Sequence, residues 1–382
     1  MSSRTSKATA ALPVKEYLRL LRRSDLLRSS ALGQANELAG SIQDAVRLGE
    51  ELVRLGILTH WQNSQLQGGR SRGFLLGRYI LLDVLGGGGV CRVYLGEHTI
   101  LNRHGAIKVL ARARSNRGSL SERLIQEARA IACLKHPNVV EAYDIGAHNG
   151  LHYIVMELVR GIDLARMVKC TGPLREERAA DYVIQAAAGL HHAHQHDIVH
   201  RDVKPANLLV DSSGVVKVLD LGVARVESLE QSSITLKYDE KILGTVDYLA
   251  PEQARNSHNV DLRADIYGLG CTLYFLLSGQ PPFAQGSLAE RTLKHQFEMP
   301  VPIDRLQPKV SPELANICQR MMAKQPDARY QSMDEVIRVL KLWWTARTIE
   351  RAAEETHRGD NTADTRILLR RESLEAIGLG NG

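Results

Sequence analysis

The chain is poor in aromatic residues and in cysteine. Only 5% of its 382 residues are aromatic, and its five cysteines stand far apart, with no pair separated by two residues. A nucleic-acid-binding protein typically interleaves basic and aromatic residues, and a zinc site or a disulfide framework needs paired cysteines. The composition therefore argues against both kinds of protein and favours a reducing compartment.

Long hydrophobic runs are also missing. The most apolar stretch, Ile266 to Leu277, is shorter than the roughly 20 residues that a helix needs to cross a bilayer. Charges interrupt the N-terminal segment before a signal-peptide core can form. We expect a cytoplasmic protein with no integral membrane segment, in which residues 266–277 form a buried helix.

Excess charge is small and unevenly placed. The net charge is +6, and residues 1–77 hold 11 basic and 6 acidic side chains, so the rest of the chain is almost neutral. A neutral main body offers no basic surface, and no nucleic-acid partner is expected. The basic run from Arg19 to Arg28 could touch acidic lipid or a partner, but a solvated helix face is the commoner explanation.

Hydrophobic periodicity divides the chain into parts. Residues 14–66 repeat apolar residues at helical spacing, which predicts three or four short helices followed by a glycine-rich linker. Short β-rich runs then precede a region of helices. The strands are predicted at 79–85, 93–96, 105–110, 139–146 and 151–158, and the helices at 119–135, 175–196, 262–278, 289–296, 311–324 and 333–348.

This order of elements predicts an α+β, two-lobed architecture preceded by a small helical module. The helical module and its linker span 1–72. The main domain spans 73–343, with a small β-rich lobe at about 79–158 and a larger helical lobe at about 160–343. A charged tail follows at 344–382; it is expected to be mostly mobile, with a short helix at 364–376.

A cluster of glycines joins the first two predicted strands. The segment consists of Leu85, Gly86, Gly87, Gly88 and Gly89. Glycines let backbone amides approach phosphate groups closely, although a hairpin turn is the commoner explanation for such a cluster alone.

Lys108 lies on an otherwise apolar predicted strand, between Ile107 and Val109. A lysine is costly to bury unless its ammonium is paired. Glu127, on the predicted helix that follows, is a plausible partner. The alternative is a solvated surface lysine, and the residue alone does not decide between them.

The most informative segment is His200-Arg201-Asp202-Val203-Lys204-Pro205-Ala206-Asn207, with Asp220 thirteen residues further on. The oxygen donors of Asn207 and Asp220 suit Mg²⁺, which prefers a few protein oxygens together with phosphate oxygens. Asp202 can orient a hydroxyl group and accept its proton, and Lys204 can neutralise a transferring phosphoryl group.

These motifs, in this order, resemble the protein-kinase superfamily in its bacterial serine/threonine branch. The resemblance covers about residues 79–343 and includes Gly244-Thr245 and Ala250-Pro251-Glu252. It implies a protein-kinase fold that binds ATP and Mg²⁺. It also implies that Asp202 is the catalytic base, that Lys204 contacts the γ-phosphate, and that Lys108 holds the α- and β-phosphates and pairs with Glu127. Asn207 and Asp220 would hold magnesium.

The resemblance further implies where adenine binds. Met156 would be the gatekeeper, and the backbones of Glu157 and Val159 would contact the adenine ring from the hinge. Val93 and Ala106 would cover the ring from above, and Leu209 would lie beneath it. Outside the nucleotide site, the family pattern implies that Glu252 pairs with Arg329 and that Asp265 caps the backbone of the catalytic loop.

Several positions depart from the family pattern. Cys91 stands where the third glycine of the loop is usual, so we expect looser loop closure with ATP binding retained; a redox role is the less favoured alternative. Leu221 replaces the commoner phenylalanine after Asp220 and can fill the same apolar slot. Val246 replaces the usual proline after Gly244-Thr245, which should matter little.

Arg201, beside Asp202, usually accompanies an activation loop whose phosphate neutralises the arginine. The stretch before Gly244 carries acidic residues where phosphorylatable threonines are common. We hypothesise that Asp239 or Glu240 supplies the anion, which would make the enzyme partly active without phosphorylation. The alternative is phosphorylation slightly upstream, at Ser232, Ser233 or Thr235.

Five histidines between His191 and His200 suggest a metal cluster, but their spacing fits a surface helix that leads into the catalytic loop better. The helical module resembles the region that precedes kinase domains in planctomycete-type bacteria. We expect it to dock onto the small lobe, a substrate or an unknown protein partner, since it offers no convergent polar set for catalysis.

The sequence as a whole predicts a serine/threonine protein kinase that transfers the γ-phosphoryl group of ATP to a protein substrate and phosphorylates itself. A pseudokinase scaffold is the alternative, but such a scaffold is expected to lose at least one of Lys108, Glu127, Asp202, Asn207 and Asp220. An adaptor acting through the helical module is compatible with either function.

Overall fold

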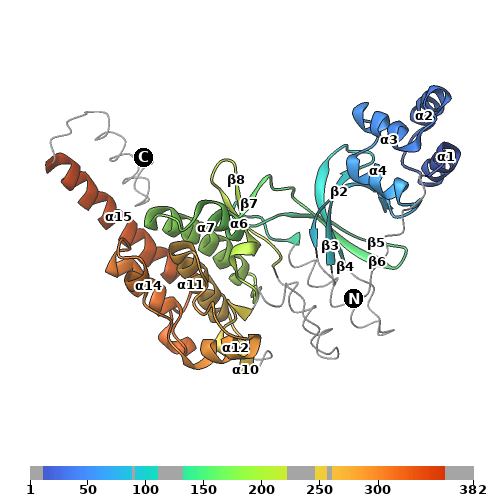
Figure 1. Ribbon diagram of the computed structural model, residues 1–382. Coiled ribbons are helices and arrows are strands. Elements are labelled where there is room, and N and C mark those ends of the chain that lie inside the picture. The colour runs from blue at the N-terminus through green and yellow to red at the C-terminus, as the bar shows by residue number, and fades with distance from the viewer. Residues whose placement is uncertain (1–11, 88–90, 111–131, 222–245, 256–259, 358–382) are drawn as a thin grey trace, which may run out of the picture. The chain divides into compact units, whose positions relative to one another are not determined.

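The computed structural model describes residues 12–87, 91–110, 132–221, 246–255 and 260–357 (Figure 1). The chain forms two compact units. The first unit comprises residues 1–116 and 142–158, and the second comprises residues 117–141 and 159–382.

The first unit begins with the helical module, which consists of α1 (Val14–Arg23), α2 (Ser29–Ser41), α3 (Ala45–Arg54) and α4 (His60–Gln67). Side chains start two of these helices: Asp44 accepts the amide of Arg47 at α3, and Thr59 forms a capping box with Gln62 at α4. The helices bury Tyr17, Leu48 and other apolar residues in a core of their own. The expected three or four short helices are confirmed.

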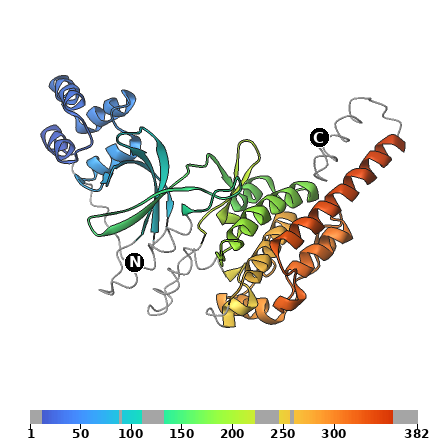
Figure 2. The ribbon, with the colours of Figure 1, turned by 180° about the vertical axis from the view of Figure 1, so that it is seen from behind.

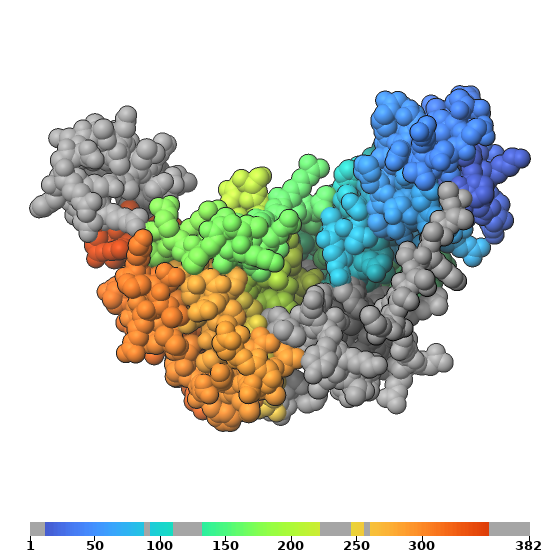
Figure 3. All heavy atoms as spheres, in the orientation of Figure 1, coloured from blue at the N-terminus to red at the C-terminus, as the bar shows by residue number. Residues whose placement is uncertain are grey.

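A six-stranded sheet follows in the same unit. The strands are β1 (Leu75–Leu76), β2 (Tyr79–Gly87), β3 (Cys91–His98), β4 (His104–Leu110), β5 (Ala142–His148) and β6 (Leu151–Met156). Their spatial order is β1-β2-β3-β4-β6-β5, with every neighbouring pair antiparallel. The helical module lies directly against this sheet (Figure 3). Within the unit, α4 contacts β2.

The strand expected at 139–146 begins three residues later, at Ala142. Val139 instead forms an isolated parallel bridge with Val218, and the amide of Val140 donates to the carbonyl of Val218. These residues therefore belong to the second unit. The helix expected at 119–135 falls almost wholly outside the described residues.

Helices dominate the second unit. Its elements are β7 (Gly161–Asp163), α6 (Leu164–Thr171), α7 (Glu176–His194), η1 (Pro205–Asn207), β8 (Leu208–Asp211), β9 (Val216–Val218), α10 (Pro251–Arg255), α11 (Arg263–Ser278), α12 (Leu288–Phe297), α13 (Ile303–Leu306), α14 (Pro312–Met321), η3 (Pro326–Ala328) and α15 (Met333–His357). The five helices predicted in this region are all present as α7, α11, α12, α14 and α15.

Helix α15 is longer than expected, since it continues from 348 to His357. Arg347 pairs with the buried carboxylate of Glu176 on α7 at 2.9 Å and with Glu350 one turn further along α15 at 3.3 Å. Both pairs favour continuation of the helix. Figure 2 shows α15 lying along α7.

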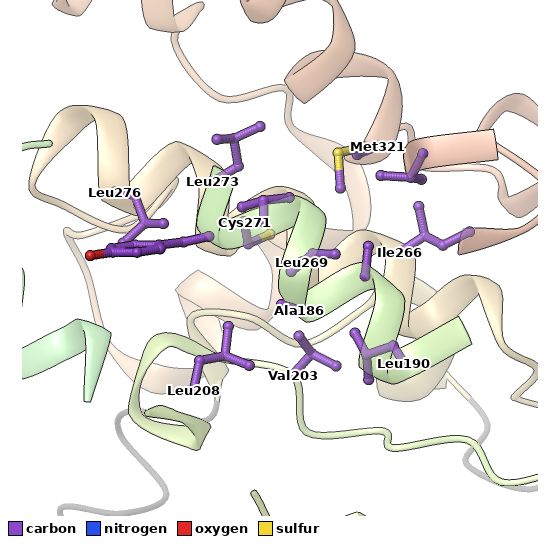
Figure 4. Packing of buried hydrophobic residues seen from close by; sticks show 14 of the residues in the cluster. Ala186, Leu190, Val203, Leu208, Ile266, Leu269, Cys271, Leu273, Leu276 and Met321 are labelled. Atoms are coloured by element: carbon purple, nitrogen blue, oxygen red, sulfur yellow. The ribbon is translucent and has the colours of Figure 1, made fainter. Parts of the chain in front are cut away.

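Helix α11 forms the centre of the second unit, and the expected buried helix at 266–277 is confirmed. Gly268 brings α11 close to the chain before β8, because a Cβ at this position would lie 2.7 Å from the carbonyl oxygen of Val203. Figure 4 shows Val203 packed in the same apolar cluster as Ala186 of α7 and Leu269 of α11. None of the helices in the described ranges is both long and apolar enough to cross a membrane.

Candidate active site

The segment between α7 and β8 carries the polar residues that the sequence singled out, and one buried carboxylate holds it. Asp265, at the start of α11, accepts the amide of His200 at 2.8 Å and the amide of Arg201 at 2.7 Å. Its third neighbour is the Nε2 atom of His194, at 2.8 Å. The carboxylate therefore satisfies two backbone donors that would otherwise be buried without partners, and the expected capping role of Asp265 is confirmed.

Asp202 lies among the side chains that the motif predicts. The Nζ atom of Lys204 is 2.7 Å from its carboxylate. The side-chain amide of Asn207 donates to the backbone carbonyl of Asp202 at 2.8 Å and to its carboxylate at 3.0 Å. Because the amide nitrogen of Asn207 faces Asp202, its amide oxygen is the atom that can bind a metal.

Two residues near Asp202 have left-handed backbone angles. Arg201 has a φ of 64° and Asp220 a φ of 57°. Such angles cost residues with a Cβ about 1–3 kcal/mol and occur often at functional sites. Hydrogen bonds hold the chain between them: His200 Nε2 is 2.8 Å from the carbonyl oxygen of Leu219, and the amide of Leu219 donates to the carbonyl of Asn207 at 2.9 Å. The hairpin of β8 and β9 thus fixes Asp220 relative to the Asp202 loop.

The donors available here fit a hard divalent cation. The amide oxygen of Asn207 and the carboxylate of Asp220 are the oxygen ligands that Mg²⁺ prefers. They also follow the order in which kinases present them along the chain.

An ion pair between Arg329 and Glu252 stabilises the same unit. Arg329 has a fully buried side chain that contacts Glu252 through two bonds, of 2.6 and 2.8 Å, and it also donates to the carbonyls of Ala323, Arg263 and Lys324. The predicted pair of Glu252 and Arg329 is therefore confirmed. Gln253 was not predicted to take part; its side-chain amide donates to the carbonyl of Arg201 at 2.7 Å. A carbonyl oxygen is present at every residue, so this contact has no sequence signature beyond a polar residue next to Glu252.

In the first unit, Lys108 lies on the central strand β4 with only 2% of its surface exposed. The interpretation as a solvated surface lysine is therefore wrong. Lys108 is directly opposite Val93 on β3, and Ala106 lies two residues earlier on β4, opposite Met156 on β6. Residues directly opposite or two apart share a face of a sheet. One face of the sheet thus carries Lys108 together with the predicted adenine-covering residues.

The other residues predicted to contact the nucleotide or to regulate the enzyme lie partly within and partly outside the described residues. Leu85, Gly86 and Gly87 form the exposed end of β2, where Gly87 has a φ of 141°. Glu157 and Val159 follow β6, and Leu209 is a half-buried residue of β8. Outside the described residues lie Gly88, Gly89, Glu127, the Gly244-Thr245 pair and the activation-segment candidates Ser232, Ser233, Thr235, Asp239 and Glu240.

The histidines that suggested a metal cluster do not converge on one point, although the rings of His192 and His196 lie next to each other, with centroids 4.7 Å apart. His194 faces Asp265, His200 faces Leu219, and the ring of His192 stacks on His136 with centroids 5.2 Å apart. Within the described ranges, no three His, Cys, Asp or Glu side chains gather in a way that could hold a metal ion.

Comparison with known proteins agrees with this geometry. The model of the protein kinase domain matches residues 79–339. The serine/threonine-protein kinase PknB of Mycolicibacterium smegmatis is 41% identical over 263 residues, which are 68% of this chain and 42% of that protein. The serine/threonine-protein kinase PrkC of Bacillus subtilis is 41% identical over 261 residues, 68% of this chain and 39% of that protein. The chain thus spans about two fifths of the length of these relatives.

Among solved structures, the kinase domain of PknI from Mycobacterium tuberculosis is similar with a TM-score of 0.55 and 27% identity, covering 70% of this chain and 97% of that domain. Residues 79–339, which match the model of the protein kinase domain, include both the strand that carries Lys108 and the loop that carries Asp202. The chain therefore belongs to the protein kinase family, with a β-sheet small lobe and a helical large lobe.

Proposed function

We propose that this protein is an ATP- and Mg²⁺-dependent serine/threonine protein kinase. The observation that carries the proposal is the contact of the Asp202 carboxylate with Lys204 and Asn207, on a loop held by buried Asp265. Asp202 is the base, Lys204 the phosphate-neutralising cation and Asn207 the metal ligand that phosphoryl transfer needs.

In the proposed reaction, a serine or threonine hydroxyl of a protein substrate attacks the γ-phosphorus of ATP. The bond from the γ-phosphorus to the bridging oxygen breaks and ADP leaves. Asp202 orients the hydroxyl and accepts its proton, while Lys204 neutralises charge on the transferring group. Asn207 and Asp220 would hold Mg²⁺, which supplies charge neutralisation at the phosphates when it is bound.

The first unit would bind the nucleotide. Lys108 would hold the α- and β-phosphates and pair with Glu127, and the glycine segment from Leu85 to Gly89 would cover the phosphates. Adenine would contact the backbones of Glu157 and Val159 and lie between the side chains of Val93, Ala106 and Leu209. Burial of Lys108 supports this assignment, because a buried ammonium needs an anionic partner.

We also propose the division into a helical module and linker (1–72), a kinase domain (73–343) and a charged tail (344–382). The module would be of the planctomycete type and could hold an unknown protein partner. Its contacts with the sheet support docking on the small lobe. Asp239 or Glu240 would supply the anion for Arg201.

The test is phosphate transfer from labelled ATP and Mg²⁺, to the protein itself and to a generic basic protein, comparing the wild type with Asp202→Asn. The variant should lose roughly 10²–10⁴-fold in rate, as expected when a general base is removed. Its thermal unfolding midpoint should stay close to that of the wild type.

The matched control is Asp211→Asn, at the other end of β8. Asp211 accepts the amides of Ser213 and Val215, and the amide oxygen of the variant can still accept them. This variant should keep full activity. A folded wild type that binds ATP but transfers no phosphate would overturn the proposal and favour a nucleotide-binding scaffold.

A further inference from the structure

Strand β2 contains an irregularity where it passes the helical module. In its pairing with β3, Leu81 lies opposite Gly96, and Asp83 lies opposite Leu95. Leu82 is therefore an extra residue, the arrangement of a β-bulge. A bulge interrupts the ladder and leaves backbone groups that need other partners.

Helix α4 supplies those partners. The hydroxyl of Thr59 donates to the carbonyl of Leu82 at 2.5 Å, and the side-chain amide of Gln62 donates to the carbonyl of Leu81 at 2.8 Å. On the same stretch, the amide of Leu81 donates to the carbonyl of Phe74 at 2.8 Å. Segments that precede β2 therefore hold three backbone groups at the bulge.

The two donors on α4 also form the cap of that helix. Thr59 Oγ1 accepts the amide of Gln62 at 3.2 Å, and Gln62 Oε1 accepts the amide of Thr59 at 2.9 Å. Each side chain thus caps the helix through an acceptor and holds β2 through a donor. Gln62 is 4% exposed, so water competes little for its bond to the strand.

The rest of α4 is fixed on both sides. Asn63 accepts the hydroxyl of Tyr17 at 2.8 Å, which ties α4 to α1. Trp61 packs edge-on against Phe74 and against Tyr94 of β3, with centroids 5.8 and 5.7 Å apart. Because α4 is held in the module and on the sheet, its two donors give β2 a rigid attachment.

This attachment lies immediately before the exposed end of β2. From Asp83 to Gly87 the strand is exposed, and it leads into the glycine segment. We propose that Thr59 and Gln62 are positioning residues for nucleotide binding, because they fix the strand that carries the glycine segment. This inference rests on the proposed kinase function, and neither residue is proposed to touch the nucleotide.

The test uses full-length variants that keep the helix cap but lose the donor. In Thr59→Asp and Gln62→Glu, a carboxylate can still accept the capping amide but has no hydrogen for the β2 carbonyl. Both are measured at pH 8.5, so that the new carboxyl groups are ionised. Thr59→Ser keeps both functions, and Ser64→Ala changes an exposed residue of the same helix; these are the controls.

Two readouts are needed, and only one depends on the nucleotide. Hydrogen exchange of the amides of residues 83–87 should become faster in the two donor-loss variants and stay unchanged in the controls. The Kd for a non-hydrolysable ATP analogue should rise roughly threefold to tenfold, the effect of losing one buried hydrogen bond. The KM for ATP should follow, with kcat changing less than about twofold.

The outcomes separate this inference from the proposed function. Unchanged exchange at residues 83–87 would show that α4 does not hold the strand. Faster exchange with an unchanged Kd would show that α4 holds the strand without positioning the nucleotide. Either result overturns the inference, whereas a wild type that binds the analogue but transfers no phosphate overturns only the proposed kinase activity.

Discussion

In the second unit, the buried carboxylate of Asp265 holds the loop that carries Asp202 through hydrogen bonds. In the first unit, two neutral side chains, Thr59 and Gln62, hold the strand that leads to the glycine segment. In both cases the side chains form hydrogen bonds with backbone amides or carbonyls that have no partner within a helix or sheet. They differ in charge, since Asp265 accepts through an ionised group and α4 donates through a hydroxyl and an amide.

The difference sets how firmly each segment is held. Hydrogen bonds to a charged group contribute about 1.5–3 kcal/mol each, against about 0.5–1.5 kcal/mol for neutral ones. The Asp202 loop should therefore be the more rigid of the two segments. The β2 attachment should be the one that a partner of the helical module can most easily alter.

The largest effect is expected where the second unit relies most on buried charge. Arg329→Met removes the charged partner of the Glu252 carboxylate and the donor of three carbonyls. The free energy of unfolding should therefore fall by about 3–5 kcal/mol. Urea unfolding followed by circular dichroism measures it. Adding Glu252→Gln should recover about 1 kcal/mol or more, and no recovery would contradict the role of the pair.

Asp265→Asn tests the charged attachment of the Asp202 loop directly. The variant is nearly isosteric, but its amide nitrogen must face one of the two backbone amides, so we expect a loss of about 2–3 kcal/mol in unfolding free energy. The rate of phosphate transfer should fall at least tenfold. A variant with wild-type rate and stability would show that the loop does not need the charge.

A buried histidine should make the stability of the second unit depend on pH. Burial, with Lys324 and Arg291 nearby, lowers the pKa of His295 to about 3, whereas an unfolded histidine has a pKa of about 6.5. Between these values only the unfolded chain takes up the proton, so stability is full above pH 6.5 and falls as the pH is lowered, by up to about 1.4 kcal/mol per unit.

His295→Gln removes this titration. Urea unfolding between pH 7 and pH 5 should show a shallower decline for the variant than for the wild type. Equal slopes would mean that His295 is not the residue responsible.

The smallest effect is expected in the first unit, where uncharged aromatic side chains, rather than ion pairs, hold α4 against the sheet. Trp61 is half-buried between Phe74 and Tyr94, so Trp61→Ala should lower the unfolding free energy by about 1–2 kcal/mol. Chemical unfolding measures the loss, and Trp61→Phe should restore part of it. A loss as large as that of Arg329→Met would remove the contrast between the units.

Residues close together in the sequence made the second unit's site predictable. Asp202, Lys204 and Asn207 lie within six residues, so a loop of any compact shape brings them near one another. The partners Asp265, Glu252 and Arg329 lie far away along the chain, and only the family resemblance pointed to them.

Contacts with backbone carbonyls could not be predicted in either unit. Gln253 reaches the carbonyl of Arg201, and Gln62 reaches that of Leu81, but a carbonyl leaves no trace in the sequence. The only signal was Thr59 followed three residues later by Gln62, the spacing of a capping box. The short strands β7 and β8 were also missed, because runs of three or four residues show too little alternation.

Because α4 binds β2 through carbonyl oxygens, the two sides of this contact differ in how freely their sequences can change among related proteins. Every amino acid carries a carbonyl, so residues 81 and 82 can change as far as sheet packing allows without losing the attachment. Thr59 and Gln62 have no such freedom, since each must accept and donate at once. Exchange of the kinase domain between such proteins should therefore preserve the attachment only when the helical module keeps a hydroxyl and an amide at these two positions.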